Sequence, residues 1–116
     1  MKNKTLTDRE KLEQEVDLVL DHCKSLLFSK AKEYANDIDR LANFRQPTSM
    51  MKTNQAKVCL MYDMKHIASI VKIAEDMDKG IYPSEEMLLE KVGDYVNYGL
   101  LFYANVLEVM ANEEAE

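Results

Sequence analysis

Glycine and proline are scarce in this chain, with three Gly and two Pro among 116 residues, and tryptophan is absent. Turn-rich β folds place Gly and Pro at many of their turns, so this composition argues against such a fold and favours long helices. A chain of this length is the size of one ordinary domain. We therefore expect residues 1–116 to form a single all-α domain.

Features of several protein classes are also missing. The two cysteines, Cys23 and Cys59, form no CxxC pair and lie within apolar helical patterns, as free thiols in a reducing cytoplasm do. No apolar run approaches the roughly 18 residues of a membrane span. The basic residues 1–5 are followed by charged residues instead of the apolar segment of a signal peptide. These absences predict a cytoplasmic protein without membrane contact.

Positive charge is in deficit, because 15 Lys and Arg stand against 21 Asp and Glu, which gives a net charge of -6. A duplex-binding surface needs clustered Lys and Arg, so free nucleic acid is a poor partner. The sequence also lacks a glycine-rich phosphate loop and a Ser-His-Asp or Cys-His ordering typical of nucleophilic enzymes. An acidic protein can still bind a nucleotide through a metal ion, or present its surface to a basic protein.

Capping signals divide the chain into helices. Thr7 and Glu10 form a capping box, which predicts a helix start. Pro47 disfavours helical geometry at the residue before it, so a break is expected there. Asn54 and Ser84 are suited to cap two further helices. The predicted elements are a helix over 7–35, short helices or a loop over 37–52, a central helix over 54–79, a last helix over 84–110 and a frayed tail over 111–116.

Apolar residues recur at helical spacing in each long segment, so each predicted helix must bury one face. The expected fold is a helical bundle of three long helices plus one or two short ones, with the last two helices antiparallel. A helical hairpin of this size closes only a limited core, so we expect a homo-oligomer, in the simplest case a dimer. Gly99 in the last helix would let another helix approach closely, either within the chain or across a dimer axis.

A polar row lies beside the apolar face of the last helix. Glu90, Asp94 and Asn97 follow an i, i+4, i+7 pattern, so their side chains share one face. Carboxylates spaced i and i+4 can hold Mg²⁺, with water and a substrate phosphate completing its coordination. A polar network between helices accounts for the same row equally well. In either case the row predicts the wall of a polar pocket.

The central helix carries a second polar group. Cys59, Asp63 and His66 share one face, but a single helix seldom supplies three metal ligands, so a buried histidine oriented by Asp63 or a tyrosine is favoured over a zinc site. Lys65 interrupts a wide apolar arc, and a partly buried lysine needs an anion as its partner. That anion is either a carboxylate of the last helix or a phosphate.

Four segments of the chain carry a resemblance to a known family. In order, they are Lys32-Glu-Tyr-Ala-Asn-Asp37, Arg40-Leu-Ala-Asn-Phe44, Lys65-His66 and Gly93-Asp-Tyr-Val-Asn-Tyr98. Together they resemble a family of small phage and prophage proteins, the nucleotide modification associated domain family, over about Leu18 to Leu107. The last helix is also similar to a segment of MazG-type nucleotide pyrophosphohydrolases, all-α enzymes that cleave nucleoside triphosphates with Mg²⁺, although Lys91 stands where their second carboxylate is expected.

The resemblance implies a phage or prophage protein that binds (deoxy)nucleotides in the host cytoplasm. Mg²⁺-dependent hydrolysis of the nucleotide, or support of nucleotide modification, would be its activity. The cationic side chains would face phosphate, the asparagines would contact base or sugar, and an aromatic ring would stack on the base. The implied nucleotide-binding residues are Lys32, Tyr34, Asp37, Arg40, Asn43, Phe44, Lys65, His66, Asn97 and Tyr98, and the implied metal ligands are Glu90 and Asp94.

A second class of function fits the same sequence. The net charge of -6, the small size and the incomplete carboxylate set are also typical of a non-catalytic acidic interaction protein, such as a phage inhibitor of a host enzyme. Such a protein would bind a basic surface with strong salt dependence.

Overall fold

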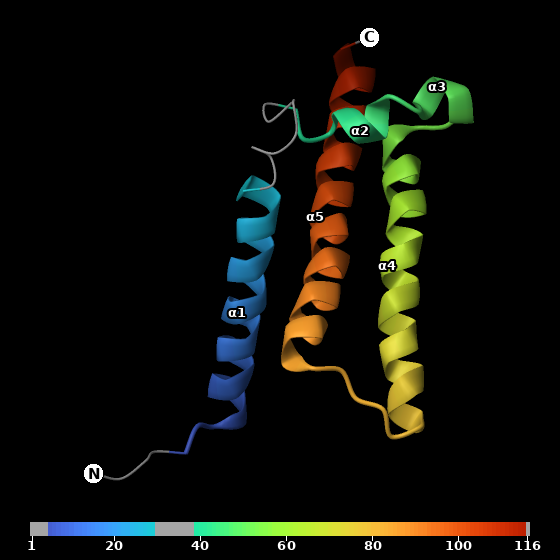
Figure 1. Ribbon diagram of the computed structural model, residues 1–116. Coiled ribbons are helices and arrows are strands. Elements are labelled where there is room, and N and C mark those ends of the chain that lie inside the picture. Colours follow the sequence, from blue (N-terminus) through green and yellow to red (C-terminus); the bar gives the residue numbers. More distant parts are fainter. Residues whose placement is uncertain (1–4, 30–38, 116) are drawn as a thin grey trace.

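The computed structural model describes residues 5–29 and 39–115, and these residues form five helices and no strand (Figure 1). The all-α class is therefore confirmed for the described part of the chain, with three long helices and two short ones. None of the described helices is long and apolar enough to cross a membrane. The helices are α1 (Asp8–Ser29), α2 (Ala42–Arg45), α3 (Thr48–Met51), α4 (Gln55–Asp78) and α5 (Glu85–Ala115).

Local capping chemistry starts the three long helices where the sequence predicts. The Thr7 N–H donates to Glu10 Oε1 and the Glu10 N–H donates to Thr7 Oγ1, both at 3.1 Å, so the capping box before α1 is confirmed. Asn54 Oδ1 accepts from the Lys57 N–H at 2.9 Å before α4. Ser84 Oγ accepts from the Met87 N–H at 3.1 Å before α5. Each bond satisfies one of the donors that a helix start leaves unpaired.

The last helix ends later than predicted, and the predicted end of the first helix lies outside the described residues. α5 continues to Ala115, so the frayed tail predicted from residue 111 is wrong for residues 111–115. Alanine and glutamate are strong helix formers, and no Gly or Pro ends the helix there. For the first helix, the predicted stretch after Ser29 lies outside the described residues.

The long helices form a layer in which α5 lies between α1 and α4 (Figure 1). α4 and α5 are antiparallel, α1 packs on α5, and the short α2 packs on α4. The buried hydrophobic core consists of Phe44, Val58, Cys59 and Leu101, with Tyr98 among the side chains packed against it. It therefore lies where α2 meets the α4–α5 pair. Both cysteines are buried free thiols, as predicted, and burial raises the pKa of Cys59 to about 11.

α1 approaches α5 closely at Gly93. A Cβ atom placed there would lie 2.7 Å from His22 Cδ2, and the Cys23 thiol donates to the Gly93 carbonyl oxygen at 3.6 Å. Around Gly99, by contrast, nothing lies within 4 Å of an added Cβ. Within the chain, the close helix approach predicted at Gly99 is therefore wrong, and it is found six residues earlier.

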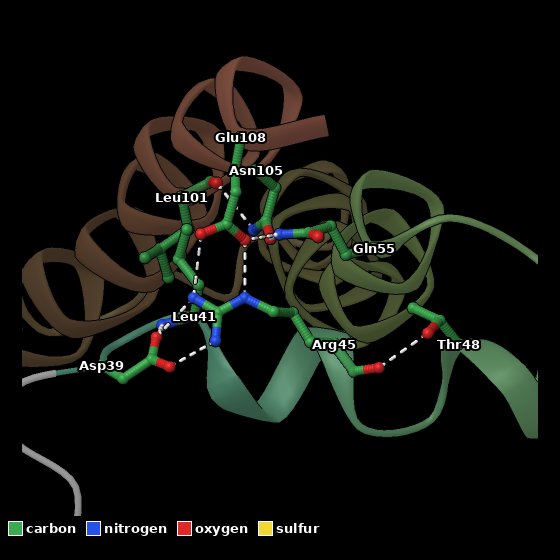
Figure 2. Close-up of polar contacts among 8 residues, drawn as sticks. All are labelled: Asp39, Leu41, Arg45, Thr48, Gln55, Leu101, Asn105 and Glu108. Carbon is green, nitrogen blue, oxygen red and sulfur yellow. Dashed lines mark hydrogen bonds and ion pairs between the residues drawn. The ribbon is translucent and has the colours of Figure 1, made fainter. Parts of the chain in front are cut away.

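A guanidinium cluster ties α2 to the end of the helical pair (Figure 2). Arg45 donates to Glu108 of α5 through Nε at 2.6 Å and through Nη2 at 3.0 Å, and it also donates to both carboxylate oxygens of Asp39. Glu108 also accepts from Gln55, whose Nε2 donates to Asn105 Oδ1 at 2.9 Å. The bonds from Arg45 hold the pKa values of Glu108 and Asp39 below their ordinary range. This cluster fixes the segment that carries Asn43 and Phe44.

Much of the apolar surface predicted to be buried is exposed in this fold. The predicted stripe of the last helix includes Leu88 and Tyr95, and both are exposed, as are several apolar residues of α4. The chain is elongated, with extents of 63 × 36 × 28 Å and a radius of gyration of 18.0 Å. A compact chain of this length would have a radius of gyration of roughly 13 Å. The helices of one chain therefore do not close a complete bundle.

Candidate functional site

Two adjoining cavities lie between the long helices and the α2 segment. The first has a volume of about 530 Å³ and the second of about 270 Å³. They share Arg40, Tyr98 and Leu101 as lining residues, so they lie next to each other. The first is also lined by Asn43, Phe44, Gln46, Pro47, Met50 and Tyr62, and the second by Leu26, Leu27, Lys65, His66, Asp94 and Asn97.

Aromatic rings form one wall of the first cavity. The Phe44 ring lies 5.8 Å from the Tyr62 ring and meets the Tyr98 ring edge-on at 6.2 Å, measured between centroids. Phe44 is buried in the core, so its ring supports the wall and offers little face to a ligand. Tyr62 is exposed and is the ring that a planar ligand can stack on.

His66, Asp94 and Tyr98 meet in the second cavity, where α4 packs on α5. The His66 and Tyr98 ring centroids are 4.6 Å apart, and His66 Nδ1 lies 3.9 Å from Asp94 Oδ2. That distance is an ion pair only when the imidazole is protonated, and it is too long for a hydrogen bond. Burial raises the pKa of Tyr98, so its hydroxyl stays neutral near physiological pH.

The same region contains buried polar atoms without a partner. Asn97 is 6% exposed and lines the second cavity, yet its Oδ1 accepts no hydrogen bond in the structure. Asp63 is buried on the facing helix, and its Oδ1 also lacks a hydrogen bond. Burial raises the pKa of Asp63, and the nearby His66 partly offsets this. An unsatisfied buried acceptor costs about 1–3 kcal/mol, so a ligand that donates to Asn97 would recover this energy.

Cationic side chains reach the second cavity from two segments. Arg40 precedes α2 and Lys65 belongs to α4, and both line the cavity beside Asp94. Lys65 is exposed in the structure, so the prediction that it is partly buried and needs an anionic partner is wrong. No ion pair joins Lys65 to Asp94. Arg40 and Lys65 have the chemistry to bind a phosphate group between them.

The two predicted metal ligands are placed differently. Asp94 lines the second cavity, whereas Glu90 lines neither cavity, and its side chain is 65% exposed with Lys91 Nζ 3.9 Å away. In the part of the chain that the structure describes, no three His, Cys, Asp or Glu side chains gather in a group that could hold a metal ion. Of the two predicted metal ligands, Asp94 alone lines the site, and magnesium binding stays a prediction. A cation there would need the phosphate of a ligand for most of its coordination.

Three predicted residues, Lys32, Tyr34 and Asp37, lie outside the described residues. Sequence reasoning missed Tyr62 as a site residue, although it lies one turn before His66 on the same helix and this spacing could have identified it. It also missed the apolar lining from Leu26 and Leu27, whose pattern resembles that of any core residue.

Comparison of the chain with protein-family models, curated proteins and solved structures finds no match. The resemblance to the nucleotide modification associated domain family therefore stays a prediction from its four sequence segments.

Proposed function

We propose that this protein binds a nucleotide in the two adjoining cavities. One observation carries the proposal. Of the ten residues that the sequence predicts to bind a nucleotide, seven lie in the described part of the chain, and all seven line these cavities. They come from the α2 segment, α4 and α5, which are far apart in the sequence. The residues are Arg40, Asn43, Phe44, Lys65, His66, Asn97 and Tyr98.

The two cavities suit different parts of the ligand. Arg40 and Lys65 provide the phosphate site in the smaller cavity, and Asn97 Oδ1 accepts from a sugar hydroxyl or base N–H. The larger cavity takes the base, which stacks on Tyr62 with Asn43 at its polar edge. Among the described residues, Arg40 and Lys65 are the cationic side chains that line the smaller cavity. Two cationic groups suit one phosphate group, so a nucleoside monophosphate is the ligand that we propose.

Thermal unfolding with nucleotides tests this proposal. A ligand at 100 times its dissociation constant adds about 2.7 kcal/mol to the free energy of unfolding, which raises the melting temperature by several degrees. We expect a nucleoside monophosphate to produce this shift and Lys65→Gln to abolish it. Lys72→Gln is the matched control, because Lys72 is an exposed lysine of the same helix that pairs with Asp76 outside both cavities.

The outcomes separate the two classes of function. If no nucleotide changes the melting temperature, the proposal is wrong and the acidic interaction protein remains. If Lys65→Gln and Lys72→Gln reduce the shift equally, the nucleotide binds through general charge attraction and not in the cavities.

Mg²⁺ is tested in the same assay with Asp94→Asn. If Asp94 holds Mg²⁺ against the ligand phosphate, the variant loses the Mg²⁺-dependent part of the shift while its own stability is unchanged or raised. If Asp94 only pairs with His66, the variant is less stable than wild type. The nucleotide-dependent shift in the wild-type melting temperature is then the same with Mg²⁺ and with a chelator. The second result removes the metal from the proposal and leaves nucleotide binding in place. Hydrolysis and a role in nucleotide modification stay predictions from the family resemblance.

A further inference from the structure

α4 presents a row of exposed apolar side chains, here called the α4 stripe. It consists of Leu60, Met64, Ile67 and Val71, which are 45%, 65%, 41% and 49% exposed. Their spacing of four, three and four residues is that of the a and d positions of a coiled coil, and Ala74 continues it. Soluble monomers rarely expose a contiguous apolar row of this kind, so the stripe is suited to pack against another helix.

The helices of the same chain pack on other sides of α4. α5 contacts α4 through the buried Cys59 and through His66, and α1 packs on α5. At 100° per residue, Lys65 and His66 point roughly 130° away from the centre of the stripe. The stripe therefore lies on a different side of α4 from the nucleotide cavities, and covering it leaves them open.

Charges beside the stripe indicate what covers it. Lys57 and Glu75 are exposed and are 18 residues apart, which is five full turns, so they lie on the same flank at opposite ends of the stripe. Neither side chain forms an ion pair within the described residues. In an antiparallel pair of α4 helices, Lys57 of each copy faces Glu75 of the other. In a parallel pair, Lys57 of one copy and Glu75 of the other would lie about 27 Å apart along the helices and could not pair.

We propose that two copies of this chain associate through their α4 stripes, packed antiparallel about a two-fold axis between Met64 and Ile67. In this register Met64 of each copy packs against Ile67 of the other, and Leu60 packs against Val71. The same contact is made twice, and both Lys57–Glu75 pairs form, as an isologous interface requires. The interface also covers apolar surface that the elongated chain cannot bury alone.

Sedimentation velocity over about 1 to 100 µM protein tests the association. We expect the wild type to reach twice the chain mass of 13.4 kDa and Ile67→Glu to remain at one chain mass with an unchanged helical circular dichroism spectrum. Leu12→Glu is the control, because Leu12 is a similarly exposed apolar residue on α1, and it should leave the dimer intact. A wild type that is monomeric at 100 µM overturns the proposal, and so does a dimer that Ile67→Glu leaves unchanged.

A charge exchange tests the antiparallel register and guards against a misfolded Ile67→Glu variant. Lys57→Glu alone and Glu75→Lys alone each place like charges at both ends of the interface, which should raise the dimer dissociation constant roughly tenfold at low salt. The double variant restores opposite charges and should restore the wild-type constant. If the double variant is as weak as the single variants, the antiparallel register is wrong.

Discussion

Two glycines of α5 differ in what a methyl group would meet, and this gives opposite predictions for the same substitution. Gly93→Ala places a Cβ 2.7 Å from His22 Cδ2, so α1 or the imidazole must shift, and we expect a loss of about 1–2 kcal/mol in the free energy of unfolding. Gly99→Ala meets nothing within 4 Å and should gain up to about 1 kcal/mol from helix propensity.

Urea unfolding of both variants measures the difference. A Gly93→Ala protein that is as stable as Gly99→Ala would show that α1 does not pack on α5 at this point. If Gly99→Ala instead disrupts the dimer, the association surface lies on α5 and the α4 register is wrong.

For single residues, the sequence predicts hydrogen bonds to nearby residues better than contacts between distant helices. The helix caps at Thr7, Asn54 and Ser84 follow from interactions within three residues, and the structure has all of them. The glycine at which α1 packs closely on α5 depends on where the two helices meet. That position is set by contacts such as the Cys23–Gly93 hydrogen bond, whose residues are 70 apart in the sequence. Local periodicity does not contain that information, so Gly99 was an equally good candidate before the packing was known.

At the scale of the element, α2 depends on long-range bonds because a four-residue helix is too short to be stable alone. Glu108 has a pKa lowered chiefly by its bonds from Arg45, so its contribution to stability is complete at neutral pH and is lost as the pH falls through its folded-state pKa. We expect Glu108→Gln to cost about 1.5–3 kcal/mol at pH 7. The difference from wild type should shrink as the pH is lowered towards about 3.

Urea unfolding at pH 7, 5 and 3 follows this difference. Glu113→Gln is the control, because Glu113 is an exposed glutamate of the same helix without an ion pair in the described residues, and it should match wild type at each pH. A difference between Glu108→Gln and wild type that is constant with pH would show that the Arg45 bonds do not stabilise the ionised carboxylate.

The long helices and their starts are largely predictable from the sequence, but the end of α5 and the long-range hydrogen bonds to α2 are not. Each long helix has a local start signal and an apolar periodicity, and both are visible in one sequence. The acidic composition of residues 111–116 predicts a frayed tail, whereas the Ala and Glu residues there continue the helix to Ala115. The bonds between Arg45 and Glu108 join residues 63 apart, so sequence spacing gave no sign of them.

At the scale of the whole molecule, the sequence shows that several apolar faces need a partner but not which chain provides it. The facing sides of α4 and α5 bury polar residues such as Gln55, Asp63 and Asn97, while apolar residues such as Met64 point outward. Periodicity grouped the residues of each face, but Leu88 and Tyr95, which it predicted to be buried, are exposed in the single chain. It could not distinguish burial within one chain from burial between two copies, because both satisfy the same pattern.

If the α4 stripe is buried between two copies, the stability of the protein should depend on its concentration. If folding and association are coupled, the stability of the dimer changes by mass action, and a hundredfold rise in protein concentration adds about 2.7 kcal/mol. We expect the wild-type melting temperature to rise by roughly 5–10 °C over this range, given the unfolding entropy of a dimer of this size. The melting temperature of Ile67→Glu should be lower and independent of concentration. Scanning calorimetry at several protein concentrations measures both.

Nucleotide binding should not depend on dimerisation, because the α4 stripe and the cavities lie on different sides of α4. The Ile67→Glu variant tests this. The variant should keep the melting-temperature shift produced by a nucleoside monophosphate, although it has lost the concentration dependence. If the shift disappears together with the dimer, the second copy is needed to complete the nucleotide site. In that case the description of the cavities as a site within one chain is wrong, because residues of both copies must then form it.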